Sequence, residues 1–182
     1  MIEPYIETSS GKSFYFMDPK PEQIDINDIA FALSNNCRFN GHCSDFMSVA
    51  EHSIAVARRL RSKGFDTRLC RTGLLHDAAE AYITDMPSPI KQFLPDYNKM
   101  EEKIMEVIGE KYNLDWDNYK EVKQADWEQL SDEAHYLLPS QGNDWSLWRG
   151  IRPEIDPEYM PLNMEPKTAA FAFMKMFKEL DE

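Results

Sequence analysis

The chain is predicted to fold as an all-α domain, a helical bundle with a small β-hairpin at its N-terminus. Apolar residues recur at helical spacings through most of the chain. Capping residues, glycines and prolines mark where the helices begin and end. The length of 182 residues, with 42% hydrophobic and 29% charged side chains, is ordinary for a soluble domain. We therefore expect residues 1–182 to form a single domain.

The first expected elements are the hairpin and a short helix. Two short runs in YIETSSGKSFYFMD flank Ser10 and Gly11, which is the pattern of two strands joined by a turn. After a proline-rich segment, Asp25 or Asn27 can cap a helix that continues through Leu33.

Two helices are expected next. Ser48 can cap a helix that runs to about Ser62, and Gly64 marks its end. Thr67 can cap a second helix, and the apolar spacing carries that helix through Ala81. These two helices hold most of the candidate site.

Proline divides the second half of the chain. Pro87 and Pro89 interrupt the helical pattern, because proline cannot continue a helix. Beyond them we expect a short helix over 90–94, a long helix over about 96–111, another over about 116–138, an ordered loop over 141–166 and a final amphipathic helix.

Composition narrows the partners and the compartment. A net charge of −12 disfavours polymeric nucleic acid, whose phosphates such a surface repels. No run approaches the ~20 apolar residues of a membrane span. The three cysteines form no CxxC pair, and the first residues carry no apolar signal core, so we expect a cytoplasmic protein without a disulfide framework.

The run GLLHDAAEAYITDMPSPIK, residues 73–91, is the most informative stretch. It places His76 beside Asp77, Glu80 one turn later and Asp85 beyond the helix. An imidazole nitrogen and a carboxylate oxygen side by side can bind one divalent metal.

Two further residues complete a candidate ligand set. His52 lies in the apolar stripe of its helix, and Asp126 lies in the middle of an apolar face of a later helix. A buried carboxylate without a partner is costly, so Asp126 is expected to be paired or bound to metal. A lone inward histidine or aspartate is more often structural, but with His76 and Asp77 the four side chains converge from three helices.

The remaining histidines are not expected to bind metal. His135 is expected at the surface, on the opposite face from Asp126 and beside Asp132. His42 lies near Cys37 and Cys43, but their spacing fits no zinc pattern and is expected to belong to a loop.

With these residues in place, the chain resembles the HD-domain phosphohydrolases. Within that superfamily it is similar to the bacterial and phage 5′-deoxynucleotidases (YfbR-like and prophage YfdR-like proteins). The order His, His-Asp, Asp identifies the superfamily, and an arginine-aromatic pair, Glu80 and TDMPSPIK identify the branch. The likeness is carried by SGKSFYF, INDIAFALSNNCRFNGH, SVAEHS, LLHDAAEAYITDMPSPIKQFLPDYNKMEEKI and VKQADWEQLSDEA.

The resemblance implies a site for one divalent transition metal, Co, Mn, Zn or Fe. The implied ligands are His52, His76, Asp77 and Asp126. Such a metal lowers the pKa of a bound water toward neutrality and thereby supplies the nucleophile for phosphate hydrolysis.

The resemblance also implies the substrate-binding and catalytic residues. Arg38 would hold the phosphate. Together with the metal that Asp77 helps to bind, Arg38 would stabilise the transition state. Phe39, where some relatives have Trp, would lie against C2′ of the sugar, and Asp85 would accept a hydrogen bond from the 3′-hydroxyl. Glu80 would lie beside the attacking water and the leaving oxygen.

Two other side chains have less definite roles. Lys91 ends the matched motif and fits either a phosphate contact or a solvated lysine. Glu133 is expected to support the ligands or to pack between helices rather than to act in catalysis.

The function implied is release of the 5′-phosphate from small-molecule deoxyribonucleoside 5′-monophosphates. Two alternatives remain open, a deoxynucleoside triphosphohydrolase and a catalytically silent HD module that binds nucleotide. The resemblance also implies a homo-oligomer. The last helix, with Phe171, Phe173, Met174 and Phe177, fits an interface or the core.

Overall fold

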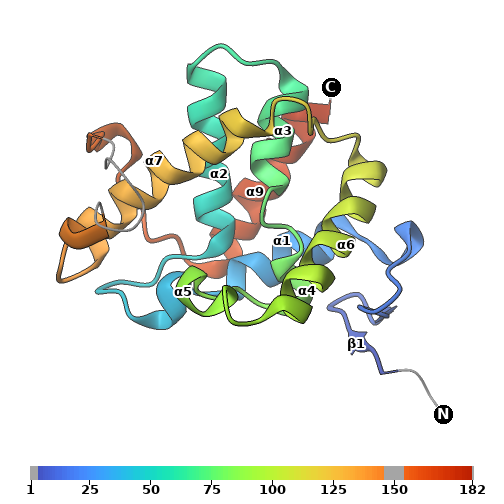
Figure 1. Ribbon diagram of the computed structural model, residues 1–182. Helices are drawn as coiled ribbons and strands as arrows, with labels where there is room; N and C mark the ends of the chain where they lie inside the picture. The colour runs from blue at the N-terminus through green and yellow to red at the C-terminus, as the bar shows by residue number, and fades with distance from the viewer. Residues whose placement is uncertain (1–3, 146–153, 182) are drawn as a thin grey trace.

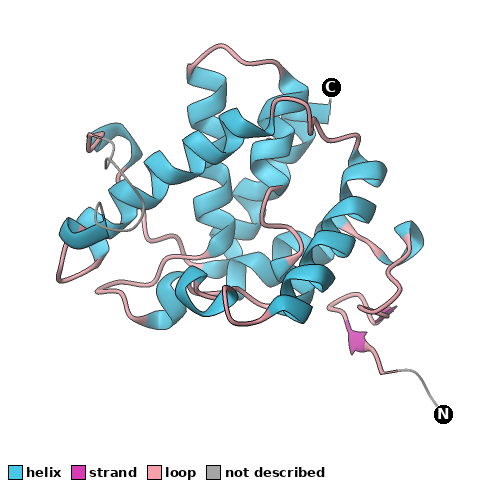
Figure 2. Cartoon of the chain, viewed as in Figure 1, coloured by secondary structure: helices cyan, strands magenta, loops and turns pink. Residues whose placement is uncertain are grey.

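The computed structural model describes residues 4–145 and 154–181 and shows an all-α bundle with a small N-terminal hairpin (Figure 1). Helices α2 and α3 pack side by side, and each contacts both α7 and α9. Helix α1 packs on α2, α4 and α9. Nearly all of the drawn chain is helix or loop (Figure 2). The main helices are α1 (Ile26–Asn35), α2 (Val49–Ser62), α3 (Thr67–Leu75), α6 (Pro95–Tyr112), α7 (Tyr119–Leu137) and α9 (Pro166–Asp181).

The predicted hairpin is confirmed. Strand β1 (Ile6–Glu7) pairs antiparallel with β2 (Ser13–Phe14). Gly11 lies in the turn with a φ of +80°, a conformation that glycine adopts without steric cost. Phe14 is fully buried and stacks on Tyr82 of α4 (Glu80–Ile83), which fastens the hairpin to the bundle.

Both early helix caps are confirmed. The Asp25 carboxylate accepts a hydrogen bond from the Asn27 amide at the start of α1. The Ser48 hydroxyl accepts one from the Glu51 amide at the start of α2. Each cap satisfies a backbone donor that has no partner within its helix, so the sequence fixes where each helix begins.

The prediction of one helix from Thr67 through Ala81 is wrong. Asp66, not Thr67, caps α3 by accepting a hydrogen bond from the Leu69 amide. Helix α3 ends at Leu75, and α4 begins only at Glu80.

The cause of the break lies in the backbone between the two helices. The Ala78 amide donates to the Leu75 carbonyl, and the Glu80 amide donates to the Asp77 carbonyl. These bonds span three residues, so the chain turns more tightly than an α-helix. The directions of Asp77 and Glu80 therefore depart from the helical periodicity.

Two other helix boundaries differ from prediction. Helix α5 (Ser88–Lys91) begins two residues before the expected 90–94, because proline fits the first turn of a helix. Helix α7 begins three residues after Trp116. There the Asp115 carboxylate accepts bonds from the amides of Asp117 and Asn118, which stabilises a turn instead of a helix.

The expected loop over 141–166 holds short 3-10 segments at Asn143–Trp145 and Pro157–Tyr159, and residues 146–153 lie outside the described part. In α9, Phe173 and Phe177 are buried in the core, whereas Phe171 is exposed. Among the described residues, no helix combines the length and apolar character required to span a membrane.

Candidate metal centre

The four candidate ligands meet between α2, α3 and α7. His52 projects from the buried face of α2, and His76 follows the last residue of α3. Asp77 lies in the turn before α4, and Asp126 lies on α7. His52 is completely buried and His76 nearly so, while the two carboxylates are partly exposed toward a cavity.

The ligand atoms of His52, His76 and Asp126 all lie within 4.8 Å of one another, close enough to share one ion, and Asp77 lies beside this group. The two Nε2 atoms of His52 and His76 are 3.4 Å apart. The Asp126 carboxylate is 3.2 Å from His52 Nε2, and the Asp77 carboxylate is 3.2 Å from His76 Nε2. Atoms that coordinate one transition metal at about 2.1 Å lie roughly 3.0–3.4 Å apart. The donor set and its spacing therefore fit a divalent transition metal.

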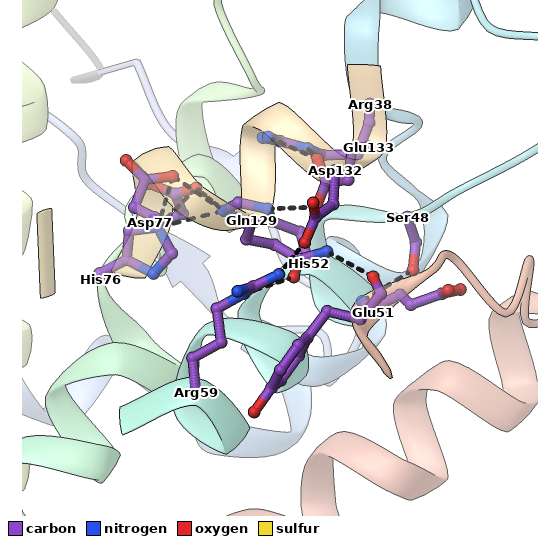
Figure 3. Close-up of polar contacts among 12 residues, drawn as sticks. Arg38, Ser48, Glu51, His52, Arg59, His76, Asp77, Gln129, Asp132 and Glu133 are labelled. Carbon is purple, nitrogen blue, oxygen red and sulfur yellow. Dashed lines mark hydrogen bonds and ion pairs between the residues drawn. The ribbon is translucent and has the colours of Figure 1, made fainter. Parts of the chain in front are cut away.

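The two imidazoles are oriented by their second nitrogen atoms. His52 Nδ1 is 2.6 Å from a Glu133 carboxylate oxygen, and His76 Nδ1 is 2.8 Å from the Gly73 carbonyl oxygen. Both partners accept hydrogen bonds, so each ring donates from Nδ1 and directs the lone pair of Nε2 into the site. Figure 3 shows His52, His76 and Asp77 meeting beside the buried Glu133.

Charge at the site favours a cation. Burial raises the pKa of Asp126, but hydrogen bonds from His52 and His76 outweigh it and hold the pKa well below its usual value. Burial likewise raises the pKa of Asp77, and the His76 charge outweighs it. Burial lowers the pKa of His76, while Asp77 and Asp126 bring it well above normal. The lowered pKa values of both carboxyl groups favour their ionised forms, which suit the binding of a cation.

A cavity of about 400 Å³ opens beside these ligands. Asp77 and Asp126 form part of its wall, and Trp145 lies on its rim with its ring centre 6.3 Å from that of Phe39. The other candidate site residues that line it are Arg38, Phe39, Glu80, Asp85 and Lys91.

The segment Arg38–Gly41 presents two of these side chains. Phe39 and Asn40 adopt left-handed conformations with φ of 54°, and Gly41 has a φ of 78°. Such backbone is costly for a residue with a bulky side chain and is typical of functional loops. The turn places the buried Arg38 guanidinium and the half-buried Phe39 ring on one wall of the cavity.

Glu80 is a buried acid at the cavity wall. Only 3% of the residue is exposed, and its Oε2 atom has no hydrogen-bond partner among the described residues. Burial raises its pKa well above normal, the charges of Asp77 and Asp85 raise it further, and Lys91 and Arg38 oppose them only in part. These effects favour the protonated form of the side chain.

Lys91 is not a solvated lysine. Its ammonium group lies 2.6 Å from Glu101 and 3.4 Å from Glu80. Asp85 is half-buried, and burial raises the pKa of its carboxyl group. Both side chains remain at the cavity wall, where they can contact a ligand.

Two contributors were missed or underrated from the sequence. Lys123 lines the cavity and was not identified, although its position three residues before Asp126 places it on the same helical face. Glu133 was expected to have a supporting role, but the structure shows that it contacts both His52 and Arg38.

The opposite face of α7 is more buried than the expected surface position of His135 suggested. Asp132 is fully buried and pairs with Arg59, and His135 is half-buried. Arg59 reaches Asp132 from α2, so a cross-helix ion pair occupies a face that polarity alone assigned to solvent.

Comparison with known proteins finds relatives that match different shares of the chain. No family model matches the chain. The chain is 42% identical over 178 residues to the uncharacterized protein YfdR of Escherichia coli, across 98% of this chain and 96% of that protein. It is 33% identical over 110 residues to an uncharacterized protein of Rhodobacter capsulatus, across 58% of this chain and 56% of that protein. It is 30% identical over 109 residues to a 5′-deoxynucleotidase of Photobacterium profundum, across 43% of this chain and 56% of that protein.

Proposed function

The chain belongs to the family of Escherichia coli YfdR, and from this premise we propose that it is an HD-domain, metal-dependent phosphohydrolase acting on deoxyribonucleoside 5′-monophosphates. The observation that carries the proposal is the convergence of three features around one cavity: two aspartates on its wall with two histidines behind them, a buried arginine and a buried glutamic acid of raised pKa. The partial similarity to a 5′-deoxynucleotidase supports the same reaction class.

The metal ligands in this proposal are His52, His76, Asp77 and Asp126. A divalent ion held by them supplies a Lewis acid and a water of lowered pKa. The two imidazoles arrive with their Nε2 lone pairs already directed at the ion, so little reorganisation is required on binding.

Arg38 binds the phosphate in this proposal. Its guanidinium lies at the cavity wall and stays charged, since the Glu133 carboxylate outweighs the effect of burial on its pKa. A planar fork of N–H donors matches the oxygens of a phosphate group and stabilises the charge that develops on them.

Glu80 supplies the proton for the leaving oxygen. An alkoxide at O5′ is a poor leaving group and requires a proton donor. The raised pKa of Glu80 favours its protonated form, and its Oε2 atom, which has no partner among the described residues, can donate to O5′. Phe39 and Asp85 contact the sugar in this proposal, at C2′ and at the 3′-hydroxyl.

The charges of the cavity favour a monophosphate over a triphosphate. Among the described lining residues, the cations Arg38, Lys91 and Lys123 face the carboxyl groups of Asp77, Glu80, Asp85 and Asp126. A neighbouring cavity of about 410 Å³ shares Asp77, Lys91 and Lys123 and adds Glu101, Glu102 and Glu106. A polyphosphate tail in that direction meets further negative charge.

A phosphate-release panel tests the proposal. Deoxynucleoside monophosphates, ribonucleoside monophosphates and deoxynucleoside triphosphates are each supplied with Mn²⁺, Co²⁺, Fe²⁺ or Zn²⁺. We expect inorganic phosphate from the deoxynucleoside monophosphates and none after chelation. Release of pyrophosphate or triphosphate from the triphosphates would favour the triphosphohydrolase, and binding without turnover would favour the silent module.

A further inference from the structure

Glu133 joins the metal centre to the phosphate-binding residue. It lies on α7 and is completely buried. One carboxylate oxygen, Oε1, lies 2.6 Å from His52 Nδ1. The other oxygen, Oε2, accepts hydrogen bonds of 3.1 and 3.0 Å from Nε and Nη2 of Arg38. Figure 3 shows Glu133 between these two partners.

Each oxygen of this carboxylate therefore orients a different working group. The bond to Oε1 fixes the proton of His52 on Nδ1 and leaves Nε2 for the metal. The bonds to Oε2 fix two of the guanidinium nitrogens of Arg38, which leaves Nη1 for an outside ligand. Because the carboxylate is rigid and planar, a rotation that improves one set of bonds disturbs the other.

The other histidine has no such link. His76 Nδ1 contacts the carbonyl of Gly73, three residues earlier in its own chain segment. Its orientation is therefore set locally, whereas that of His52 depends on a carboxylate from another helix and on the arginine beyond it.

From this geometry we infer that Glu133 is a positioning residue that couples metal binding at His52 to phosphate binding at Arg38. The inference rests on the proposed function for the identity of the two ligands, a divalent metal and a phosphate group. It assigns Glu133 no contact with substrate.

The chain offers a matched control in Asp132. This neighbouring carboxylate is also fully buried on α7 and also pairs with an arginine, Arg59. Arg59 bonds Gln129 and Asp132, and Gln129 in turn hydrogen-bonds Glu133. Asp132→Asn therefore removes a buried ion pair next to the bridge while leaving the bonds of Glu133 to His52 and Arg38 in place. Any loss common to Asp132→Asn and Glu133→Gln reflects stability or packing around Gln129 and not the bridge itself.

The experiment measures binding separately from turnover. Calorimetry gives the affinity of the apo protein for Co²⁺, the visible absorption of bound Co²⁺ reports the ligand geometry, and thermal melting reports stability. We expect Glu133→Gln to weaken Co²⁺ binding by about 10–100-fold and to alter its absorption spectrum. Asp132→Asn should leave both unchanged.

The second half of the test uses inorganic phosphate with saturating Co²⁺. Glu133→Gln should weaken phosphate binding by about tenfold, the equivalent of one charge-assisted hydrogen bond. The double variant Arg38→Ala/Glu133→Gln should bind phosphate no more weakly than Arg38→Ala, because two residues that act as one unit are not additive. Additive losses would overturn the coupling.

The variant Glu133→Asp provides a second test in case Glu133→Gln does not fold. Glu133→Asp keeps the buried charge but is one methylene too short to hold both partners. Its affinities for Co²⁺ and for phosphate should therefore fall, but by less than those of Glu133→Gln. Wild-type affinities in Glu133→Gln or Glu133→Asp would overturn the inference. If both affinities fall as expected while the wild-type protein hydrolyses no nucleotide, the positioning role stands and the proposed function fails.

Discussion

In the proposed function, Arg38 is the residue that binds the phosphate group. It is 8% exposed and is neutralised by the fully buried Glu133. We expect Arg38→Ala to lower kcat/KM for a deoxynucleoside monophosphate by ~10²-fold or more, because charge developing on the phosphate loses its donor. Steady-state kinetics with saturating metal measures this, and unchanged kinetics would mean that phosphate is bound elsewhere.

The raised pKa of Glu80 leads to a prediction about how activity depends on pH. Its pKa is raised in the folded protein by burial first and by Asp77 and Asp85 next, which favours the protonated donor. Activity that requires this proton is lost as pH rises through the folded pKa, and the stability from the raised pKa is lost over the same rise.

The isosteric change Glu80→Gln tests this role. It keeps the shape of the side chain but removes the transferable proton, so kcat should fall by ~10²–10⁴-fold. The alkaline decline of kcat that depends on Glu80 should also disappear. Glu101→Gln, which removes a partner of Lys91 instead, is the control. A pH profile of Glu80→Gln that matches the wild type would exclude proton donation by this residue.

At the scale of elements, the turn Arg38–Gly41 predicts sugar selectivity. Phe39 is half-buried at the cavity wall, and its ring centre lies 6.3 Å from that of Trp145. We expect Phe39→Ala to remain folded and to reduce the preference for deoxynucleotides over ribonucleotides, because it opens space at C2′.

Asp85→Ala is the companion variant and should weaken every substrate that carries a 3′-hydroxyl. A site built around a hydroxyl penalises ligands that lack it, so 2′,3′-dideoxynucleotides should be poor substrates of the wild type. Kinetics with matched deoxy, ribo and dideoxy monophosphates decides the matter. If Phe39→Ala is folded and its ratio of activity on deoxynucleotides to ribonucleotides is unaltered, Phe39 does not select the sugar.

The cap of α1 gives a prediction about stability. The Asp25 carboxylate bonds Lys12 of the hairpin segment and the Asn27 amide. We expect Asp25→Ala to lower the free energy of unfolding by ~1 kcal/mol. Asp25→Asn should lose less, since asparagine also caps helices. Urea unfolding of the three proteins at neutral pH measures both effects.

Acid titration separates the ion pair from the cap. Hydrogen bonds from Lys12 and from the Asn27 amide lower the pKa of Asp25 from 3.8 to about 2. A lowered pKa stabilises the fold above the unfolded-state value, and this contribution is lost as pH falls toward the folded-state value. The difference between wild type and Asp25→Asn should therefore shrink between about pH 4 and pH 2. A constant difference would exclude the ion pair as its source.

At the scale of the whole molecule, the candidate metal centre joins α2, the turn after α3 and α7. A ligand that binds only the folded state stabilises it by mass action, about 2.7 kcal/mol at a hundred times its Kd. Chelation should therefore lower the melting temperature, and restoring metal should recover it.

Asp77→Ala should abolish metal-dependent phosphate release and most of the metal-dependent rise in melting temperature. Asp45→Ala, at an exposed loop position, should keep both. Circular dichroism checks that the helical content is retained. Full activity in metal-stripped Asp77→Ala would show that the ligand assignment is wrong.

The sequence by itself determined the helical architecture and the inward direction of two candidate ligands. Asp25 and Ser48 start their helices through bonds to amides two or three residues away, so the signal is local. His52 and Asp126 could be placed because helical periodicity relates each to apolar residues of its own helix.

Only the tertiary structure decided the features that depend on contacts between elements. The break before Glu80, the pairing of Lys91 with Glu101 and the burial of Asp132 have no counterpart in helical periodicity. Glu133 is 81 residues from His52 and 95 from Arg38, and it meets both only where α7 crosses α2 and the turn after α1. Helical spacing relates residues three or four positions apart, so a bridge across such separations is set by packing alone.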